Sequence, residues 1–362
     1  MQTPSVLPWI FLGLACHGAP SPRSRPGRAT QAEHEPAPLH HESEVHLGRI
    51  RQLTFGGENA EGYFNSAGDR IVFQARKGST GYDCDQIFEM DLASRATRLV
   101  STGRGKTTCA YYLAGDRRIL YSSTHLSGPD CPPEPSRARG YVWSIHPAYD
   151  IFSVGTDGSS DLVRMTDTPG YDAEATYCVA IDRLVFTSVR DGDLELYSMR
   201  PDGSDIRRLT HRLGYDGGAF FSRDGRKIVW RAHYPSTAEA KKEFLDLLGR
   251  GLVRPSKMEI WIAEADGGKP RQLTENGRAN FAPYFFPSGN RVIFASNMTG
   301  SPRMFHLYAI DTETREIERI TYSSRFNSFP MFSPDGKYLV FASNRNNSRP
   351  GETNLFLAEW RD

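Results

Sequence analysis

The chain has 362 residues, a length that fits one large domain or two ordinary ones and that all-β barrels and propellers often use as a single unit. Hydrophobic residues make up 38% of the chain and aromatic residues 11%, a combination typical of sheet proteins with many turns and ring-filled cores. The formal net charge of +1 removes the electrostatic argument for binding to nucleic acid or to an acidic membrane surface.

The first 47 residues differ in composition from the rest. The apolar run VLPWIFLGLA (6–15) is too short to cross a bilayer and leads into the small-residue stretch ACHGA, as in a secretory leader. We therefore assign residues 1–16 to a signal or lipoprotein leader and expect export to the periplasm or cell envelope of a bacterium. Membrane attachment would depend on a lipid on Cys16. Residues 17–47 are rich in Pro, Arg, Ser, Glu and His and are predicted to be a disordered linker.

From residue 48 onward, a unit of four short strands repeats six times. Its most regular strand is apolar and reads RIVFQA (70–75), RILYSS (118–123), RLVFTS (183–188), KIVWRA (227–232), RVIFAS (291–296) and YLVFAS (338–343). Most copies follow a tight turn such as SRDG or SPDG, and each is followed by a second strand. All but the last then end in a short strand of R-x-L-T type. Four-strand units of about 45 residues are the signature of a β-propeller blade.

The R-x-L-T strand also occurs at residues 49–54, where no unit precedes it, while the sixth unit ends at TNLFLAEWRD without one. Residues 49–55 should therefore pair with residues 353–360 and close the ring. Closure removes the exposed strand edges that promote aggregation. The predicted fold is an all-β, six-bladed propeller over residues 48–362.

The S-P-D-G turn, the strand ending in F-A-S and the R-x-L-T segment together resemble the WD40-like repeat of the TolB-like propeller family. FSPDGKYLVFASNR (332–345) and LYSMRPDGSDIRRLT (196–210) are close matches, and the resemblance covers residues 48–362. It implies a six-bladed propeller of the bacterial cell envelope that acts as a protein-binding platform. TolB proper has a folded domain before its propeller, which 47 residues cannot hold, so the partners of TolB are not implied for this chain.

Both long insertions of the repeat, residues 124–148 and 233–257, fall between the second and third strands of a blade. These connections emerge on the same side of a propeller as those between blades, so this inserted face is predicted to carry the function. In the second insertion, Ser236 and Glu239 should form a capping box, and Gly249 should end the helix. The helix is either a lid over the channel or a packed decoration.

Acidic, aromatic and histidine residues gather at the connections of the inserted face. We predict ligand binding by nine of them: Glu61, His125, His146, Tyr171, Asp172, Glu174, Tyr215, Asp216 and His233. A converging ring of carboxylates could hold a divalent, calcium-like cation or amines. The alternative is that these carboxylates accept hydrogen bonds from neighbouring loop amides. The histidines lack the spacing of zinc ligands.

Three cysteines, Cys84, Cys109 and Cys131, are predicted to lie on the inserted face of adjacent blades. In an exported protein two of them should form a disulfide, with Cys109 the favoured member. Cys178 is expected to be a small buried residue.

These features favour an exported, monomeric and non-catalytic propeller that binds a protein, peptide or glycan on its inserted face. The sequence has no motif of a serine hydrolase, a metalloprotease or a dinucleotide-binding enzyme, and no hydrolase domain is expected after the propeller. The alternative is a metal-assisted polysaccharide lyase or hydrolase that works at the mouth of the channel.

Overall fold

The structure is a computed structural model that describes residues 39–362 except 137, 139 and 159–160. The predicted leader, with Cys16, and most of the predicted linker lie outside the described residues. Within the described range, 26 strands form six four-stranded sheets and one two-stranded sheet. No helix in this range is long and apolar enough to cross a bilayer.

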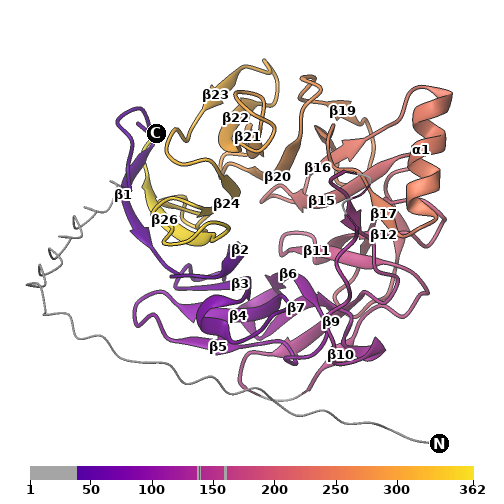
Figure 1. The fold of residues 1–362 in the computed structure, drawn as a ribbon, viewed down its shortest axis with the longest axis horizontal. Helices are drawn as coiled ribbons and strands as arrows, with labels where there is room; N and C mark the ends of the chain where they lie inside the picture. Colours follow the sequence, from indigo (N-terminus) through magenta and orange to yellow (C-terminus); the bar gives the residue numbers. More distant parts are fainter. Residues whose placement is uncertain (1–38, 137, 139, 159–160) are drawn as a thin grey trace, which may run out of the picture. The chain divides into compact units, whose positions relative to one another are not determined.

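The six four-stranded sheets are the blades of a propeller and follow one another around a central axis (Figure 1). Blade 1 contains β2 (Glu58–Phe64), β3 (Arg70–Arg76), β4 (Gln86–Asp91) and β5 (Thr97–Leu99). Blade 2 contains β6 (Thr107–Tyr112), β7 (Arg118–Ser123), β9 (Asp150–Gly155) and β10 (Val163–Arg164). Blade 3 contains β11 (Asp172–Cys178), β12 (Arg183–Ser188), β13 (Glu195–Met199) and β14 (Arg207–Arg208).

The remaining blades have the same order, with the first strand nearest the axis. Blade 4 contains β15 (Tyr215–Phe221), β16 (Lys227–His233), β18 (Glu259–Glu264) and β19 (Arg271–Gln272). Blade 5 contains β20 (Asn280–Phe285), β21 (Arg291–Ser296), β22 (His306–Asp311) and β23 (Ile317–Arg319). Blade 6 contains β24 (Asn327–Phe332), β25 (Tyr338–Ser343), β26 (Asn354–Trp360) and β1 (Leu47–Gln52). Short 3₁₀ turns lie at Gly78–Thr80, Ala114–Asp116 and His125–Ser127.

The composition of blade 6 confirms that the N-terminal strand closes the ring. β1 pairs with β26 in antiparallel orientation, with Ile50 opposite Ala358 and Gln52 opposite Phe356. The strand begins at Leu47, two residues before the predicted start. The first and last strands of the ring are therefore held together by a backbone hydrogen-bond ladder.

The hydroxyl at the end of each R-x-L-T segment explains why this segment recurs. In every blade it accepts a hydrogen bond of 2.8–3.0 Å from a backbone N–H near the start of the third strand. The acceptor and donor pairs are Ser101–Ile87, Thr166–Ile151, Thr210–Leu196, Thr274–Ile260, Thr321–Leu307 and Thr54–Leu355. In blade 6 the hydroxyl comes from the N-terminal segment, so the repeat is complete in space although it is split in sequence.

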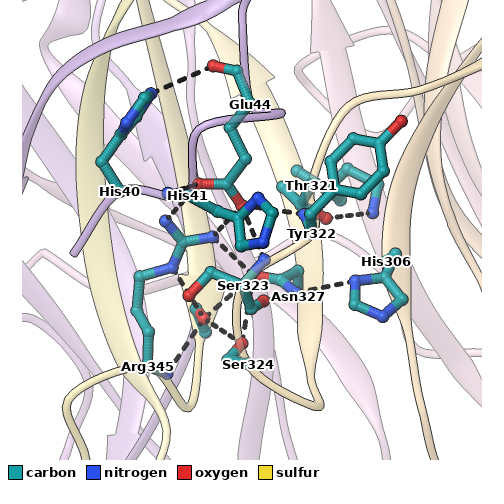
Figure 2. A network of polar contacts seen from close by, with 12 residues as sticks. His40, His41, Glu44, His306, Thr321, Tyr322, Ser323, Ser324, Asn327 and Arg345 are labelled. Atoms are coloured by element: carbon teal, nitrogen blue, oxygen red, sulfur yellow. Dashed lines mark hydrogen bonds and ion pairs between the residues drawn. The ribbon is translucent and has the colours of Figure 1, made fainter. Parts of the chain in front are cut away.

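Residues 39–46, which the sequence assigned to the disordered linker, instead pack against blades 5 and 6 (Figure 2). The Glu44 carboxylate is fully buried and accepts hydrogen bonds from the backbone N–H groups of Tyr322 (2.9 Å) and Ser323 (3.0 Å). It also forms an ion pair with the buried guanidinium of Arg345 at 3.1 Å, and Arg345 donates to the carbonyl of Leu39. The composition of residues 39–46 gives no sign of this contact, because the segment is polar overall and the burial of one carboxylate does not change its composition.

The innermost strand of every blade has a β-bulge at the same place. The first residue of each bulge adopts a left-handed backbone, with φ between +47° and +60°. The six bulge residues are Glu61, Cys109, Glu174, Gly218, Ala282 and Phe329. They occupy equivalent positions around the axis, so they face the central channel together.

Aromatic rings fill the channel next to the bulges, on the side of the S-P-D-G turns. The Tyr63 ring lies 5.6 Å from those of Tyr111 and Phe220, and the Phe220 ring lies 5.2 Å from that of Tyr284. These rings come from blades 1, 2, 4 and 5 and meet across the axis. The channel is therefore closed, and the inserted face has its own blind pocket.

The two insertions pair with each other over blade 3. β8 (Trp143–Ser144) of the first insertion and β17 (Leu252–Val253) of the second form the two-stranded sheet. The predicted helix is α1 (Ala238–Leu248), and Gly249 ends it as expected. Its N-cap is Thr237, whose hydroxyl accepts from the Ala240 N–H, so the prediction of Ser236 was wrong by one residue. Phe244 and Val253 pack in one apolar cluster, which makes the helix a support for the paired insertions.

Candidate functional site: a pocket at the channel mouth

A pocket of about 500 Å³ lies at the centre of the inserted face, and we call it the mouth pocket. The bulge residues Glu61, Cys109, Glu174 and Phe329 line it, and residues 141–146 of the first insertion form part of its wall. Rigid strands therefore position its floor, while the inserted loops deepen it. A largely preformed cavity of this kind is the usual setting of a ligand site.

One side of the mouth pocket is aromatic. Phe281 lies 5.5 Å from Phe305 and 5.3 Å from Trp143 between ring centroids, and Phe305 lies 6.2 Å from Phe326. We call these four half-buried residues the aromatic wall; all line the pocket. Phe281 and Phe305 come from blade 5, Phe326 from the connection between blades 5 and 6, and Trp143 from the first insertion, whereas the carboxylates come from blades 1 to 3.

A buried ion pair between Glu174 and Arg231 lies at the floor. The Glu174 carboxylate also accepts from the Thr187 hydroxyl and from the Gly218 N–H, both at 2.9 Å. Gly218 has φ of +60°, and a Cβ there would collide with the Arg231 guanidinium, so the missing side chain makes room for the arginine. Arg231 also donates to the Tyr215 hydroxyl at 2.7 Å. Donors from blades 3 and 4 thus occupy the acceptor positions of the Glu174 carboxylate.

Two buried polar atoms at the floor have no hydrogen-bond partner among the described residues. They are Oε2 of Glu61, an acceptor when ionised, and Nε of Arg231, a donor. Burial raises the pKa of Glu61 to about 7, and repulsion from Glu174 adds to this, although Cys109 and Arg231 oppose it. An unsatisfied buried polar group costs about 1–3 kcal/mol. A ligand that accepts from Arg231 and donates to Glu61 would remove both penalties.

The thiol of Cys109 lies beside Glu61 but is not a nucleophile. Burial raises its pKa well above the usual range, and the negative charges of Glu61 and Glu174 raise it further. The thiol therefore stays protonated at neutral pH, and the thiolate is the reactive form.

The structure brings five of the nine predicted ligand residues together. Glu61, His146, Tyr171, Glu174 and Tyr215 line the mouth pocket. Burial lowers the pKa of His146, and the nearby Lys106 lowers it further, so this imidazole is neutral at pH 7.

The other four predicted residues, His125, Asp172, Asp216 and His233, lie outside the mouth pocket. His125 contacts the Ser123 hydroxyl at 2.9 Å, and His233 donates to the Lys257 carbonyl at 2.8 Å. Each histidine therefore makes a local contact: Ser123 lies two residues before His125, and Lys257 lies at the other end of the insertion that begins with His233.

Asp172 and Asp216 are buried structural groups. The Asp172 carboxylate accepts from Arg190 at 3.0 and 3.1 Å. One oxygen of Asp216 accepts from the Trp230 indole at 2.6 Å and from the Tyr234 hydroxyl. The expectation that these carboxylates converge in the channel was therefore wrong. The donors to Asp172 and Asp216 are side chains, whereas the alternative expectation was that backbone amides of neighbouring loops would donate to them.

Sequence reasoning missed Arg231, although a signal was present. Arg231 is the fifth residue of the apolar strand and lies next to the bulge. The equivalent residues in the other blades are Gln74, Ser122, Thr187, Ala295 and Ala342. This column is polar in blades 1 to 4 and apolar in blades 5 and 6, which matches the division of the mouth pocket into a polar side and an aromatic side.

A disulfide joins Cys84 of blade 1 to Cys131 of the first insertion. Two of the three predicted cysteines are thus paired, but the favoured member, Cys109, is free. Cys109 is a bulge residue, and the left-handed backbone turns its side chain to the pocket floor instead of the insertion. Cys178 is free and buried, as expected.

The described residues contain no group of three His, Cys, Asp or Glu side chains placed to hold a metal ion. Of the carboxylates expected to form a calcium-like site, Asp172, Glu174 and Asp216 are engaged by neighbouring side chains, whereas Glu61 has no ion-pair partner among the described residues.

Comparisons with known proteins agree with the fold. The TolB beta propeller domain family matches residues 248–355. The Tol-Pal system protein TolB of Roseobacter denitrificans is 28% identical over 134 residues, which is 37% of this chain and 27% of that protein. The chain spans less than half the length of the relatives it matches in sequence.

Two solved structures illustrate the likeness. TolB from Acinetobacter baumannii has a TM-score of 0.57 at 15% identity, over 82% of this chain and 65% of that one. An oligogalacturonate lyase from Vibrio parahaemolyticus has a TM-score of 0.53 at 11% identity, over 85% and 79%. At such identities the likeness shows the fold alone. Together with the strand order, these similarities show a six-bladed β-propeller of TolB-like fold, of which residues 248–355 match the TolB beta propeller domain family.

Proposed function

We propose that the protein is an exported, non-catalytic propeller that binds a protein segment, a peptide or a glycan in the mouth pocket. The observation that carries this proposal is the pair of unpartnered polar atoms, Glu61 Oε2 and Arg231 Nε, at the floor of a preformed cavity with an aromatic wall. A concave site with an apolar lining and a few convergent polar groups is the common form of a ligand site.

Support for export comes from the Cys84–Cys131 disulfide, because such bonds persist mainly in oxidising compartments. The leader-like residues 6–19 agree with it. A monomeric state is supported by the pairing of β1 with β26, which leaves the ring without a break. Lipid attachment through Cys16 stays a prediction.

The alternative of a metal-assisted lyase or hydrolase has less support. A raised pKa at Glu61 suits a general acid or base, but such a group needs a metal or a second catalytic side chain in reach. The described residues gather no metal-ligand trio, and the Cys109 thiol stays protonated. The likeness to a lyase is one of fold.

The proposal is tested with the whole protein and four probes: cellobiose, digalacturonic acid, phenethylamine and tri-alanine. Binding is observed by saturation-transfer NMR. At least one probe is expected to bind the wild type, to lose binding with Trp143→Ala and to keep it with Asp335→Ala in a turn of the opposite face. The proposal fails if no probe contacts the wild type, or if Asp335→Ala abolishes binding while Trp143→Ala does not.

A further inference from the structure

The chemistry of the mouth pocket narrows the class of ligand, an inference that rests on the proposed function. We propose that the pocket takes a neutral saccharide. The apolar face of a sugar ring lies against the aromatic wall, and neighbouring hydroxyls contact Glu61 and Arg231.

The two unpartnered atoms require opposite hydrogen-bond roles from one ligand. The carboxyl of Glu61 offers an acceptor, whereas Arg231 Nε offers a donor, and the Arg231 side chain is only 10% exposed. A hydroxyl donates one hydrogen bond and accepts two, so adjacent hydroxyls of a sugar satisfy both atoms without a change of charge.

The charges around the floor disfavour an anionic ligand. Arg231 is already paired with Glu174. The other cations that line the pocket, Arg76 and Lys106, contact Glu134 at 3.2 and 3.4 Å and lie within 4.0 Å of Asp85. Every cation among these lining residues thus has a carboxylate partner. A carboxylate or phosphate ligand would compete with a bound side chain.

A cationic ligand is disfavoured by the state of Glu61. This is the one carboxylate of the described lining residues without an arginine or lysine partner in an ion pair, so an ammonium group would depend on it. Burial favours the neutral carboxyl there, and a neutral carboxyl gives an ammonium no compensating charge. A hydroxyl hydrogen-bonds to either form.

The aromatic side chains and the volume of the pocket suit a ring. The half-buried rings of Phe281, Phe305 and Trp143 offer apolar area, and the volume of about 500 Å³ falls within the range of small-ligand sites, about 300–1,000 Å³. The innermost strand of each blade is paired on one side only, so the tri-alanine probe, and not strand pairing, distinguishes a peptide from a sugar.

The test is isothermal calorimetry with the full chain and three neutral disaccharides: cellobiose, maltose and N,N′-diacetylchitobiose. At least one is expected to bind. Glu61→Gln should weaken it by less than about fivefold, because the amide still donates and accepts, whereas Phe281→Leu should weaken it by about tenfold or more. Glu61→Gln preserves side-chain size, Phe281→Leu keeps a large apolar side chain without the ring, and a thermal melt checks folding. The matched controls, exposed Glu264→Gln and exposed Phe55→Leu, should leave affinity unchanged.

Other outcomes separate this inference from the proposed function. If phenethylamine or tri-alanine binds in a manner that Trp143→Ala abolishes, and no neutral disaccharide binds, the saccharide is wrong while the pocket function stands. If digalacturonic acid alone binds there, the charge argument fails. Binding of phenethylamine that Glu61→Gln weakens by about a hundredfold would indicate a cationic ligand and also overturns the inference. If no probe binds, both proposals fail.

Discussion

The buried carboxyl of Glu61 links the stability of the fold to pH. Its folded pKa of about 7 lies above the ordinary value of 4.5, so the folded state holds the proton more tightly than the unfolded state. Stability should therefore fall as pH rises from about 4.5 to about 7. Glu61→Gln removes this penalty, and we expect it to be more stable than the wild type at pH 8 by at most about 3 kcal/mol.

Urea unfolding at pH 4.5 and pH 8 measures this difference. The gain of Glu61→Gln over the wild type should be larger at pH 8 than at pH 4.5. The exposed Glu264→Gln should show no such change between the two pH values. An equal effect of Glu61→Gln at both pH values would mean that Glu61 titrates as an exposed carboxyl.

Asp216 is the residue where a structural role replaces the predicted binding role. It is fully buried and accepts from Trp230 and Tyr234, so Asp216→Ala leaves one buried and one half-buried donor unpaired. We expect a loss of about 2–4 kcal/mol in chemical denaturation. Asp202→Ala, in an exposed turn, should stay within about 0.5 kcal/mol. A stable Asp216→Ala that loses ligand binding would restore the predicted role.

At the scale of elements, the buried ion pair between Glu44 and Arg345 helps to hold segment 39–46 against the blades. Replacing Glu44 by Gln leaves the Arg345 guanidinium buried with an uncompensated charge, which costs about 3–5 kcal/mol. Glu42→Gln, two residues away and exposed, is the matched control and should be silent. Thermal melts of the two variants decide the point. Equal melting temperatures would show that this ion pair does not stabilise the fold.

The first insertion is attached by the disulfide between Cys84 and Cys131. Peptide mapping without reductant should recover this pair, with Cys109 and Cys178 as free thiols. Cys84→Ser should lower the free energy of unfolding by roughly 2–4 kcal/mol because the bridge closes a loop of 47 residues. The far-ultraviolet spectrum should be unchanged, since the blades do not depend on it. Recovery of a peptide that joins Cys109 to another cysteine would contradict the structure.

At the scale of the whole molecule, the ring depends on its N-terminal strand. Deleting residues 1–57 removes β1 and the Thr54 hydroxyl and exposes the edge of β26. We expect this product to aggregate, since an unpaired edge strand is a template for association. Deleting residues 1–38 keeps both features and should yield soluble protein. Size-exclusion chromatography compares them, and similar elution would mean that closure does not stabilise the ring.

The blades and their closure could be predicted from the sequence because strand pairing between neighbours is local and repeats with a period. The site could be predicted only in part. In a regular strand Asp172 and Glu174 would share a face, but the left-handed bulge at Glu174 breaks this alternation and only Glu174 lines the mouth pocket. Pairing between β8 and β17, and burial of Glu44, join segments far apart in sequence and leave no periodic pattern.

The six bulges have a consequence for how such a propeller can diversify. A left-handed backbone costs a non-glycine residue about 1–2 kcal/mol, yet the six equivalent positions hold Glu, Cys, Glu, Gly, Ala and Phe. The fold of the blade therefore imposes the bulge, and the bulge position accepts an acidic, an apolar or a bulky side chain as well as glycine. Ala282 and Phe329 can be exchanged without altering a hydrogen bond between blades, whereas Glu174 and Gly218 are constrained by their contacts with Arg231. Ligand preference can thus change by substitutions at some of these positions while the blades themselves stay the same.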